Sequence, residues 1–163
     1  MQITFERLDA LVEIATFHNL VALLARGPYK VEHAEAVNAA LNEVLIRHPG
    51  GIVVTSLLDG PVPPLFTART PMRELIARLG DRLLLAMPIL DGNGLESYAR
   101  VAFLRGLQLV INRPTLVIAR SVDEAVRRAA PLVRRADGVQ VPHGDVVAFF
   151  AACEERLGRV TPA

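Results

Sequence analysis

The run at residues 52–58, Ile-Val-Val-Thr-Ser-Leu-Leu, constrains this chain most, because it is apolar at nearly every position. A strand with one face in water alternates apolar and polar residues, whereas a nearly continuous apolar run of this length is typical of a strand covered on both faces. Gly50 and Gly51 precede the run, and a proline-rich loop follows it. We therefore expect a central strand of a sheet with helices on both sides.

The sequence around this run alternates between helical and strand patterns. Residues 31–47 place Val37, Ala40, Leu41, Val44 and Leu45 three or four positions apart, which predicts one buried helix stripe. Residues 83–90 and 115–119 read as further buried strands. Ser121 and Glu124 form a capping box, which predicts the start of a helix at residue 121. The remaining predicted helices cover residues 70–79, 95–111 and 145–157, and the helix that starts at residue 121 runs to about residue 135.

Residues 11–26 are apolar enough to form one long helix, but their pattern favours a β-hairpin. Residues 11–17 alternate in polarity, and His18-Asn19 precedes a second apolar run at residues 20–25. Asparagine tolerates the positive φ that a tight turn requires, so we interpret His18 and Asn19 as the turn. Residues 3–5 add a short strand before the hairpin.

The resulting order predicts an α/β fold. Strands separated by helices require crossovers onto a mostly parallel sheet, here opened by an antiparallel hairpin. We expect one domain over residues 1–135, followed by a linker and an appended helix within residues 136–163. That helix carries Phe149 and Phe150, which point in different directions and must be buried on the parent sheet, on a second copy of the chain, or one on each. Both are therefore candidates for a partner or homodimer contact.

Composition excludes several classes of function. The chain has 163 residues, a net charge of +1 and one cysteine, so it has no intramolecular disulfide and no strong electrostatic footprint for nucleic acid. No apolar run approaches the roughly 18 residues that a membrane span needs. The first residues also lack the basic start and apolar stretch of a signal peptide. We expect a cytoplasmic protein without membrane insertion.

Residues that carry catalysis or bind metals do not form a recognisable set. The four histidines lie in four separate segments and lack the short spacing of metal ligands. No serine lies in a nucleophile elbow, and Cys153 falls on the apolar side of the last helix, which favours a buried thiol. The sequence therefore predicts no catalytic residues, no metal and no cofactor.

Two loops are candidate sites. The loop after residue 58 starts at Asp59, carries Leu65, Phe66 and Thr67, and leads to Thr70; it suits partner docking, or it covers its own core edge. The turn Gly92-Asn93-Gly94 precedes a predicted helix, where exposed amides favour an anion. An ordinary tight turn is the favoured interpretation of that second segment.

The element order over residues 5–133 resembles the STAS (SpoIIAA-like) fold of anti-sigma-factor antagonists, and more narrowly the bacterial STAS/SEC14-like proteins. Local likenesses are residues 20–27 running into a helix, residues 103–107 together with Arg113-Pro114, and residues 121–126 opening a helix after a strand. In the antagonists a phosphorylated Ser or Thr after the central strand controls docking. This chain has Asp59-Gly60 there instead, with Thr67 and Thr70 nearby.

The resemblance implies a non-catalytic regulatory module of bacterial signalling that binds protein partners. The alternative that it implies is a carrier of a small apolar ligand or lipid, as in SEC14-type relatives. We expect the first of these, with the segment from Asp59 to Thr70, the helix that follows it and the terminal helix as candidate contact surfaces.

Overall fold

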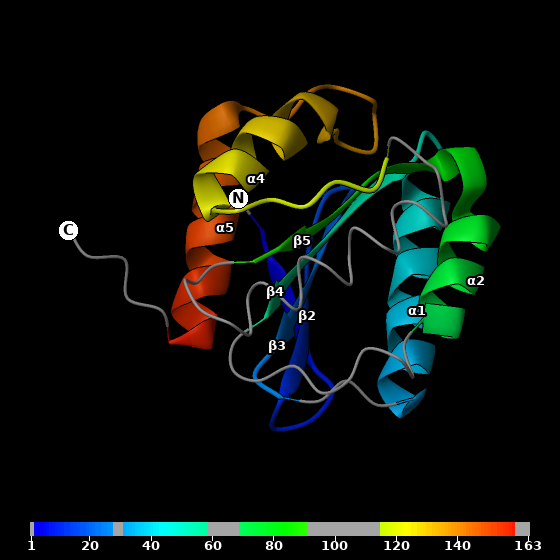
Figure 1. Cartoon of the computed structure of the whole chain (residues 1–163). Coiled ribbons are helices and arrows are strands. Elements are labelled where there is room, and N and C mark those ends of the chain that lie inside the picture. Colours follow the sequence, from blue (N-terminus) through cyan, green and yellow to red (C-terminus); the bar gives the residue numbers. More distant parts are fainter. Residues whose placement is uncertain (1, 28–30, 59–68, 91–114, 159–163) are drawn as a thin grey trace.

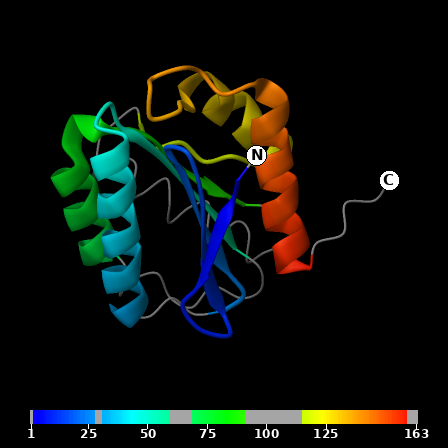
Figure 2. The same cartoon turned by 180° about the vertical axis from the view of Figure 1, so that it is seen from behind.

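The computed structural model describes residues 2–27, 31–58, 69–90 and 115–158. They form an α/β structure in which a mixed five-stranded sheet has helices on both faces (Figures 1 and 2). The elements are β1 (Thr4–Arg7), β2 (Val12–Phe17), β3 (Leu20–Ala25), α1 (Val31–Arg47), β4 (Ile52–Leu58), α2 (Arg69–Leu79), a 3₁₀ turn at Gly80–Arg82, β5 (Leu83–Ile89), α4 (Val122–Ala129), a 3₁₀ turn at Ala130–Leu132 and α5 (His143–Leu157).

The strands follow one another across the sheet in the order β1-β2-β3-β4-β5. β1, β2 and β3 are antiparallel neighbours, whereas β3, β4 and β5 run parallel. Residues 115–119 lie beside β5 in parallel orientation, with isolated bridges from Leu116 to Ala86 and from Ala119 to Ile89. The predicted pairing of this last segment is confirmed, although it forms bridges and not a continuous strand.

The predicted hairpin is confirmed, with Phe17 opposite Leu20 across a two-residue turn. The positive φ falls on His18, at 54°, and not on Asn19 as the sequence suggested. Histidine is among the non-glycine residues enriched in this conformation. The conformation of His18 leaves Asn19 free to turn inward, where it is buried.

One face of the sheet is covered by α1 and α2. Because α1 repeats its apolar residues every three or four positions, a single stripe of that helix meets the alternate residues of the strands. This layer contains Ile14, Val21, Ile52 and Leu83 from the sheet, Val37, Ala40, Leu41, Val44 and Leu45 from α1, and Ile76 and Leu79 from α2.

The opposite face is covered by α4 and α5. The rings of Phe17 and Phe149 stack with centroids 5.7 Å apart, and Phe150 meets Phe149 edge to face at 5.5 Å. Both phenylalanines of α5 are fully buried in this layer. The last helix therefore packs on its own sheet, and the expectation that Phe149 or Phe150 contacts a partner does not fit this fold, because neither side chain exposes area.

α4 begins as predicted but ends earlier. The Ser121 hydroxyl accepts the Glu124 amide at 3.2 Å, while the Glu124 carboxylate accepts the Arg120 amide at 2.9 Å, one residue before the position that a standard capping box uses. The Arg120 bond, followed by Arg128, lowers the pKa of Glu124. The helix stops at Ala129 instead of about residue 135, because Pro131 lacks an amide and the backbone tightens into a 3₁₀ turn.

The predicted linker over residues 136–144 is an ordered turn. Arg134 pairs with Gln140 in an antiparallel bridge, and the Arg135 amide donates to the Val139 carbonyl at 2.9 Å. Gly138, with a φ of 81°, makes the reversal. The helix predicted at residues 95–111 lies outside the described residues. Within the described part of the chain, no helix has the length and apolarity that a membrane crossing requires.

Candidate functional site

Most of the predicted loop residues lie outside the part of the chain that the structure describes. These are Asp59, Leu65, Phe66 and Thr67, together with Gly92, Asn93 and Gly94. Thr70 lies in the first turn of α2. Their proposed roles in partner or anion binding therefore remain predictions.

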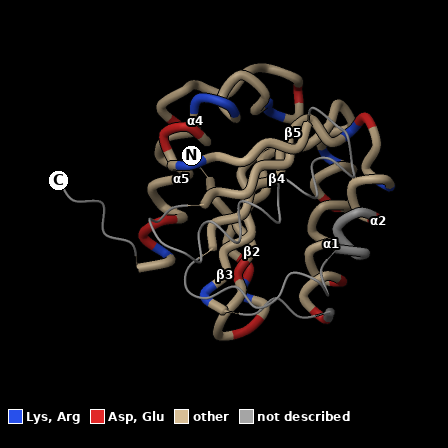
Figure 3. The backbone as a smooth tube through the Cα atoms, in the orientation of Figure 1, with Lys and Arg blue, Asp and Glu red and all other residues tan. Residues whose placement is uncertain are grey.

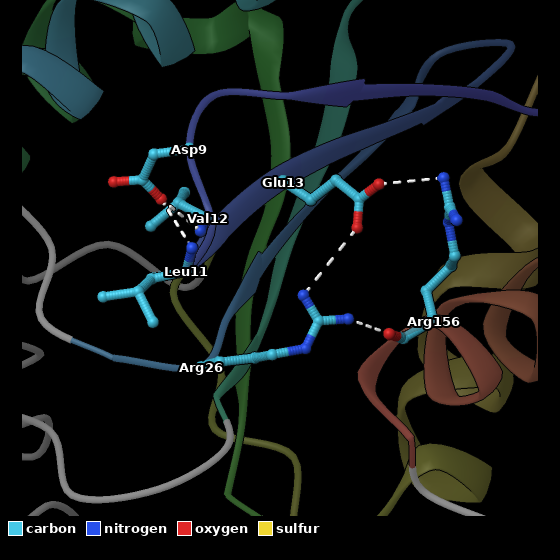
Figure 4. Close-up of polar contacts among 6 residues, drawn as sticks. All are labelled: Asp9, Leu11, Val12, Glu13, Arg26 and Arg156. Carbon is cyan, nitrogen blue, oxygen red and sulfur yellow. Dashed lines mark hydrogen bonds and ion pairs between the residues drawn. The ribbon is translucent and has the colours of Figure 1, made fainter.

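The first polar site lies at the carboxyl edge, which we define as the end of the sheet where β3, β4 and β5 finish. Glu13 of β2 is only 2% exposed there. Its Oε1 lies 3.0 Å from a guanidinium nitrogen of Arg156, and its Oε2 lies 4.0 Å from one of Arg26. Figure 4 shows the carboxylate between the two arginines. Buried charges need such partners, since removing a carboxylate from water costs several kcal/mol.

Arg26 and Arg156 also tie the end of α5 to the sheet. Arg26 follows β3 and donates a hydrogen bond to the backbone carbonyl of Arg156. The guanidinium of Arg156 lies over the ring of Phe5, 4.9 Å from its centroid. Residues from β1, β2, β3 and α5 thus meet at one point. The contacts fix the last turn of α5 against the sheet.

A third arginine shares this face. Arg7 of β1 lies opposite Glu13 in the antiparallel register, so both side chains leave the same face of the sheet. Arg7 is exposed. We call Arg7, Arg26 and Arg156 the arginine cluster.

Asp9 organises the turn between β1 and β2. Its Oδ1 accepts the amides of Leu11 and Val12 at 2.7 and 2.8 Å, and its Oδ2 lies 2.8 Å from His33 Nε2. The Leu11 amide is the main cause that lowers the pKa of Asp9, with His33 and Val12 adding to it. This aspartate is used as a turn cap and as a link to α1.

The second polar site lies at the amino edge, where β3, β4 and β5 begin. Asn19 donates to the carbonyls of Gly51 and Leu132, at 3.1 and 3.2 Å, and accepts the amide of Arg134 at 2.7 Å. These bonds use both amide hydrogens and the oxygen of one buried side chain. They join the hairpin turn, the start of β4 and the segment after α4.

Two histidines border Asn19. Burial is the main cause that lowers the pKa of His18, and the Arg135 guanidinium lowers it further, whereas Asp145 and Asp137 raise it. Burial also lowers the pKa of His48, helped by His18 and Arg47 and opposed by the Arg135 carbonyl. Both rings therefore favour the neutral form in the folded protein.

The same edge carries exposed apolar side chains. Ile46 is 82% exposed, Val139 53% and Val147 44%, and these are the large exposed apolar residues within the described ranges. Ile46 lies in the last turn of α1, Val139 in the turn after Arg135, and Val147 near the start of α5. Figures 1 and 2 show these three segments at the same end of the sheet. We call Ile46, Val139 and Val147 the amino-edge surface.

Cys153 is a core residue. It is fully buried, and burial, with Glu154 and Glu13 adding to it, raises its pKa to about 12. A thiol with that pKa is not a nucleophile near neutral pH. The described residues contain no group of three or more His, Cys, Asp or Glu side chains placed to hold a metal ion.

The sequence contained a signal for Glu13 that the predictions did not use. Glu13 lies two and four positions from Ala15 and Phe17 in β2, so its side chain leaves the sheet on the same face as these two core residues. A charged residue at a core-facing position predicts a buried ion pair. Asn19 gave no comparable signal, because its partners lie 32 and more than 110 residues away.

Comparisons with known proteins do not show a family. No protein-family model and no curated protein matches the chain. Among solved structures, an enoyl-CoA hydratase from Geobacillus kaustophilus HTA426 aligns over 98% of this chain and 92% of its own, with 11% identity and a TM-score of 0.39. A similarity at that level carries no argument about fold or function.

Proposed function

We propose that this chain is a non-catalytic regulatory module that binds a protein partner through the amino-edge surface. The observation that carries the proposal is the placement of Ile46, Val139 and Val147, the large exposed apolar side chains of the described residues, at one end of the sheet. Ile46 belongs to the helix layer on one face of the sheet, whereas Val147 belongs to the layer on the other face, so a partner that covers both spans the end of the sheet. Exposed apolar side chains that one partner can cover are candidates for an interaction site.

The segments beneath this surface are held together. Asn19 joins the hairpin turn to the segment after α4, and the Arg135 amide is bonded to the carbonyl of Val139. A surface built on a fixed framework loses little conformational entropy when a partner binds. Burying one side chain of the size of isoleucine contributes roughly 1.5–3 kcal/mol, so a few such residues supply a useful share of an affinity.

The resemblance to STAS domains supports the same class of function. An N-terminal hairpin followed by helix-connected parallel strands is the order expected of that fold, and those domains act by binding other proteins. Under this proposal the segment from Asp59 to Thr70 remains a further candidate contact, with Thr67 and Thr70 among its candidate partner-binding residues.

Site-specific photo-cross-linking in the cells that produce the protein tests the proposal. A photoreactive residue replaces Ile46 in one variant and Arg127 in a control variant, since Arg127 is an exposed residue of α4 and belongs to none of the three segments of the amino-edge surface. We expect a discrete protein adduct from position 46 and none from position 127. Equal adduct patterns, or a mass spectrum of the native protein with a bound lipid and no adduct, would contradict it.

A further inference from the structure

We infer that the outer edge of β1 pairs with the same edge of a second copy of this chain, so that two antiparallel β1 strands join two sheets into one. The contact replaces the homodimer contact that the sequence predicted in α5, where Phe149 and Phe150 are buried. The residues of the amino-edge surface lie in other elements. The inference therefore goes beyond the proposed function and rests on separate residues.

The outer edge of β1 has no neighbour in the described sheet. β1 is the first strand of the order, and among the described residues no strand pairs with its other side. Figure 2 shows it in front of the other strands. Thr4, Glu6 and Arg7 are exposed. β1 contains no proline, and its register with β2 has no bulge, so two features that prevent edge pairing are missing from it.

The hydrogen bonds of the β1–β2 hairpin show which backbone groups of β1 point outward. The Leu8 amide donates to the Val12 carbonyl at 2.9 Å. Bonded and non-bonded pairs alternate along an antiparallel ladder, so Glu6 is bonded to β2 in the same way. The amide and carbonyl groups of Phe5 and Arg7 therefore point away from β2.

The pairing of β2 with β3 gives the same assignment. The Arg26 amide donates to the Leu11 carbonyl at 2.8 Å, so the odd-numbered residues of β2 are bonded to β3. The even-numbered residues, with Ile14 among them, are bonded to β1. Glu6 is the residue opposite Ile14, which leaves the odd-numbered residues of β1 with outward backbone groups.

The charges of β1 select one register for a pair of copies. A two-fold axis at Phe5 places the two Phe5 residues opposite each other. Arg7 of each copy then lies opposite Ile3 of the other, and Glu6 lies opposite Thr4. An axis at Glu6 or at Arg7 would place two like charges directly opposite, which destabilises a pair of strands. An axis at Thr4 would align only that residue of β1 with β1 of the second copy.

This register also extends the apolar layer beneath α4 and α5. Ile3 and Phe5 are half-buried and pack against that layer. An axis at Phe5 brings the two phenylalanine rings together and lays the aliphatic stem of Arg7 on Ile3 of the second copy. The guanidinium of Arg156, which lies over the Phe5 ring, is paired with Glu13 of its own chain at 3.0 Å, so its charge is offset within each copy.

The size of the contact predicts a weak dimer. β1 has four residues, and pairing along them falls short of the interface of about 1,000 Å² that a stable complex needs. A two-fold contact uses the same surface on both copies, so it closes on itself and gives a dimer instead of a fibre. We expect a dissociation constant on the order of 100 µM.

Sedimentation equilibrium of the full chain, at concentrations up to about 1 mM, tests this inference with two variants of one exposed residue. Thr4 lies opposite Glu6 of the second copy, so Thr4→Lys adds two cross-strand ion pairs to the dimer, whereas Thr4→Glu adds two like-charge pairs. We expect the first variant to dimerise about threefold more tightly than the wild type and the second about threefold more weakly. Thermal unfolding checks that both variants fold.

Oxidative cross-linking tests the register. Phe5→Cys places two thiols opposite each other, where the Cα atoms of a bonded pair lie about 5.5 Å apart and a disulfide can form. Arg7→Cys is the matched control, because its two thiols are offset by four residues, or about 13 Å along the strands. We expect a cross-linked dimer from Phe5→Cys and none from Arg7→Cys. Cys153 is fully buried and does not compete.

Three results would overturn the inference. They are a chain that stays monomeric at about 1 mM, equal dissociation constants for the two Thr4 variants, and cross-linking through position 7 as fast as through position 5. None of these variants alters the amino-edge surface, so photo-cross-linking at position 46 is expected to be unchanged in them. The two proposals can therefore fail separately.

Discussion

The side-chain oxygen of Asn19 accepts the backbone amide of Arg134, at a distance of 2.7 Å and across 115 residues of sequence. This bond joins the first hairpin to the segment that follows the last 3₁₀ turn. The amide group of the same side chain donates to Gly51 and Leu132. One buried polar residue therefore determines how the elements at the amino edge meet.

The first prediction concerns this residue. Asn19→Ala removes three hydrogen bonds and leaves buried backbone groups without partners, so we expect a loss of about 3 kcal/mol in the free energy of unfolding. Urea denaturation measures it. Asn38→Ala on α1, where the side-chain oxygen accepts a hydrogen bond from the exposed Arg78, is the control and is expected to change the free energy by less than about 1 kcal/mol. Equal losses would contradict the role of Asn19.

The second prediction concerns the pair Glu13 and Arg156. A double-mutant cycle with Glu13→Gln and Arg156→Gln is expected to give a coupling energy of about 1 kcal/mol, since the half-exposed arginine is partly screened by water. The exposed pair of Glu43 and Arg47, 3.6 Å apart, is the matched control and is expected to give at most about 0.5 kcal/mol. A coupling no larger than that of the control would show that burial of Glu13 adds nothing.

The third prediction concerns pH. Because the pKa values of His18 and His48 are lowered on folding, the unfolded chain takes up protons first as the pH falls. Their contribution to stability is therefore complete above about pH 6.5 and is lost as the pH falls below that value. Asp9, whose pKa is lowered from 3.8, acts only in more acidic solution.

Urea unfolding at pH 7.5 and pH 5.0 measures this dependence. His18→Asn keeps a residue that tolerates positive φ and removes one of the two rings, so its stability is expected to fall less than that of the wild type between these pH values. His143→Asn, at the exposed start of α5, is expected to keep the wild-type dependence. An identical change with pH in all three proteins would refute the role of His18.

The fourth prediction compares two glycines. Gly51 has a φ of 118°, and a Cβ there would come within 2.8 Å of the Arg82 carbonyl oxygen, so Gly51→Ala is expected to cost at least about 2 kcal/mol. Gly144 has open space around the Cβ position and lies in α5, so Gly144→Ala is expected to stabilise the protein by about 0.5–1 kcal/mol. Thermal unfolding shows whether each variant is less or more stable than the wild type. Destabilisation by Gly144→Ala would contradict the open space that the structure gives to this position of α5.

Local patterns were sufficient for most of the framework. The alternation in residues 11–17 predicts β2, and the stripe in residues 31–47 predicts α1 with the bounds that the structure has. The predicted end of α4, at about residue 135, was wrong by about six residues, because the helix ends at Ala129. Pro131 was visible in the sequence, but the apolar pattern continues past it. In the structure Pro131 lies in a 3₁₀ turn that ends the helix, and the bond from the Arg134 amide to Asn19 holds the extended segment that follows.

The sites were less predictable for a physical reason. Glu13, Arg26 and Arg156 come from three separate elements, and no short motif connects them. The exposure of Ile46 depends on two things. The periodicity of the sequence predicts which face of α1 meets the sheet, but it does not predict what lies beside the end of the helix. Sequence reasoning finds faces of elements, whereas surfaces formed where several elements meet require the fold.

The affinity of the partner recovered from position 46 tests the central proposal most directly. Calorimetric titration of that partner compares the wild type with Ile46→Ser and with Ala39→Ser, an exposed small residue of the same helix. Loss of one buried isoleucine predicts about tenfold weaker binding for Ile46→Ser, and less than a twofold change is expected for Ala39→Ser. Equal affinity for all three proteins would show that the amino-edge surface is not where the partner binds.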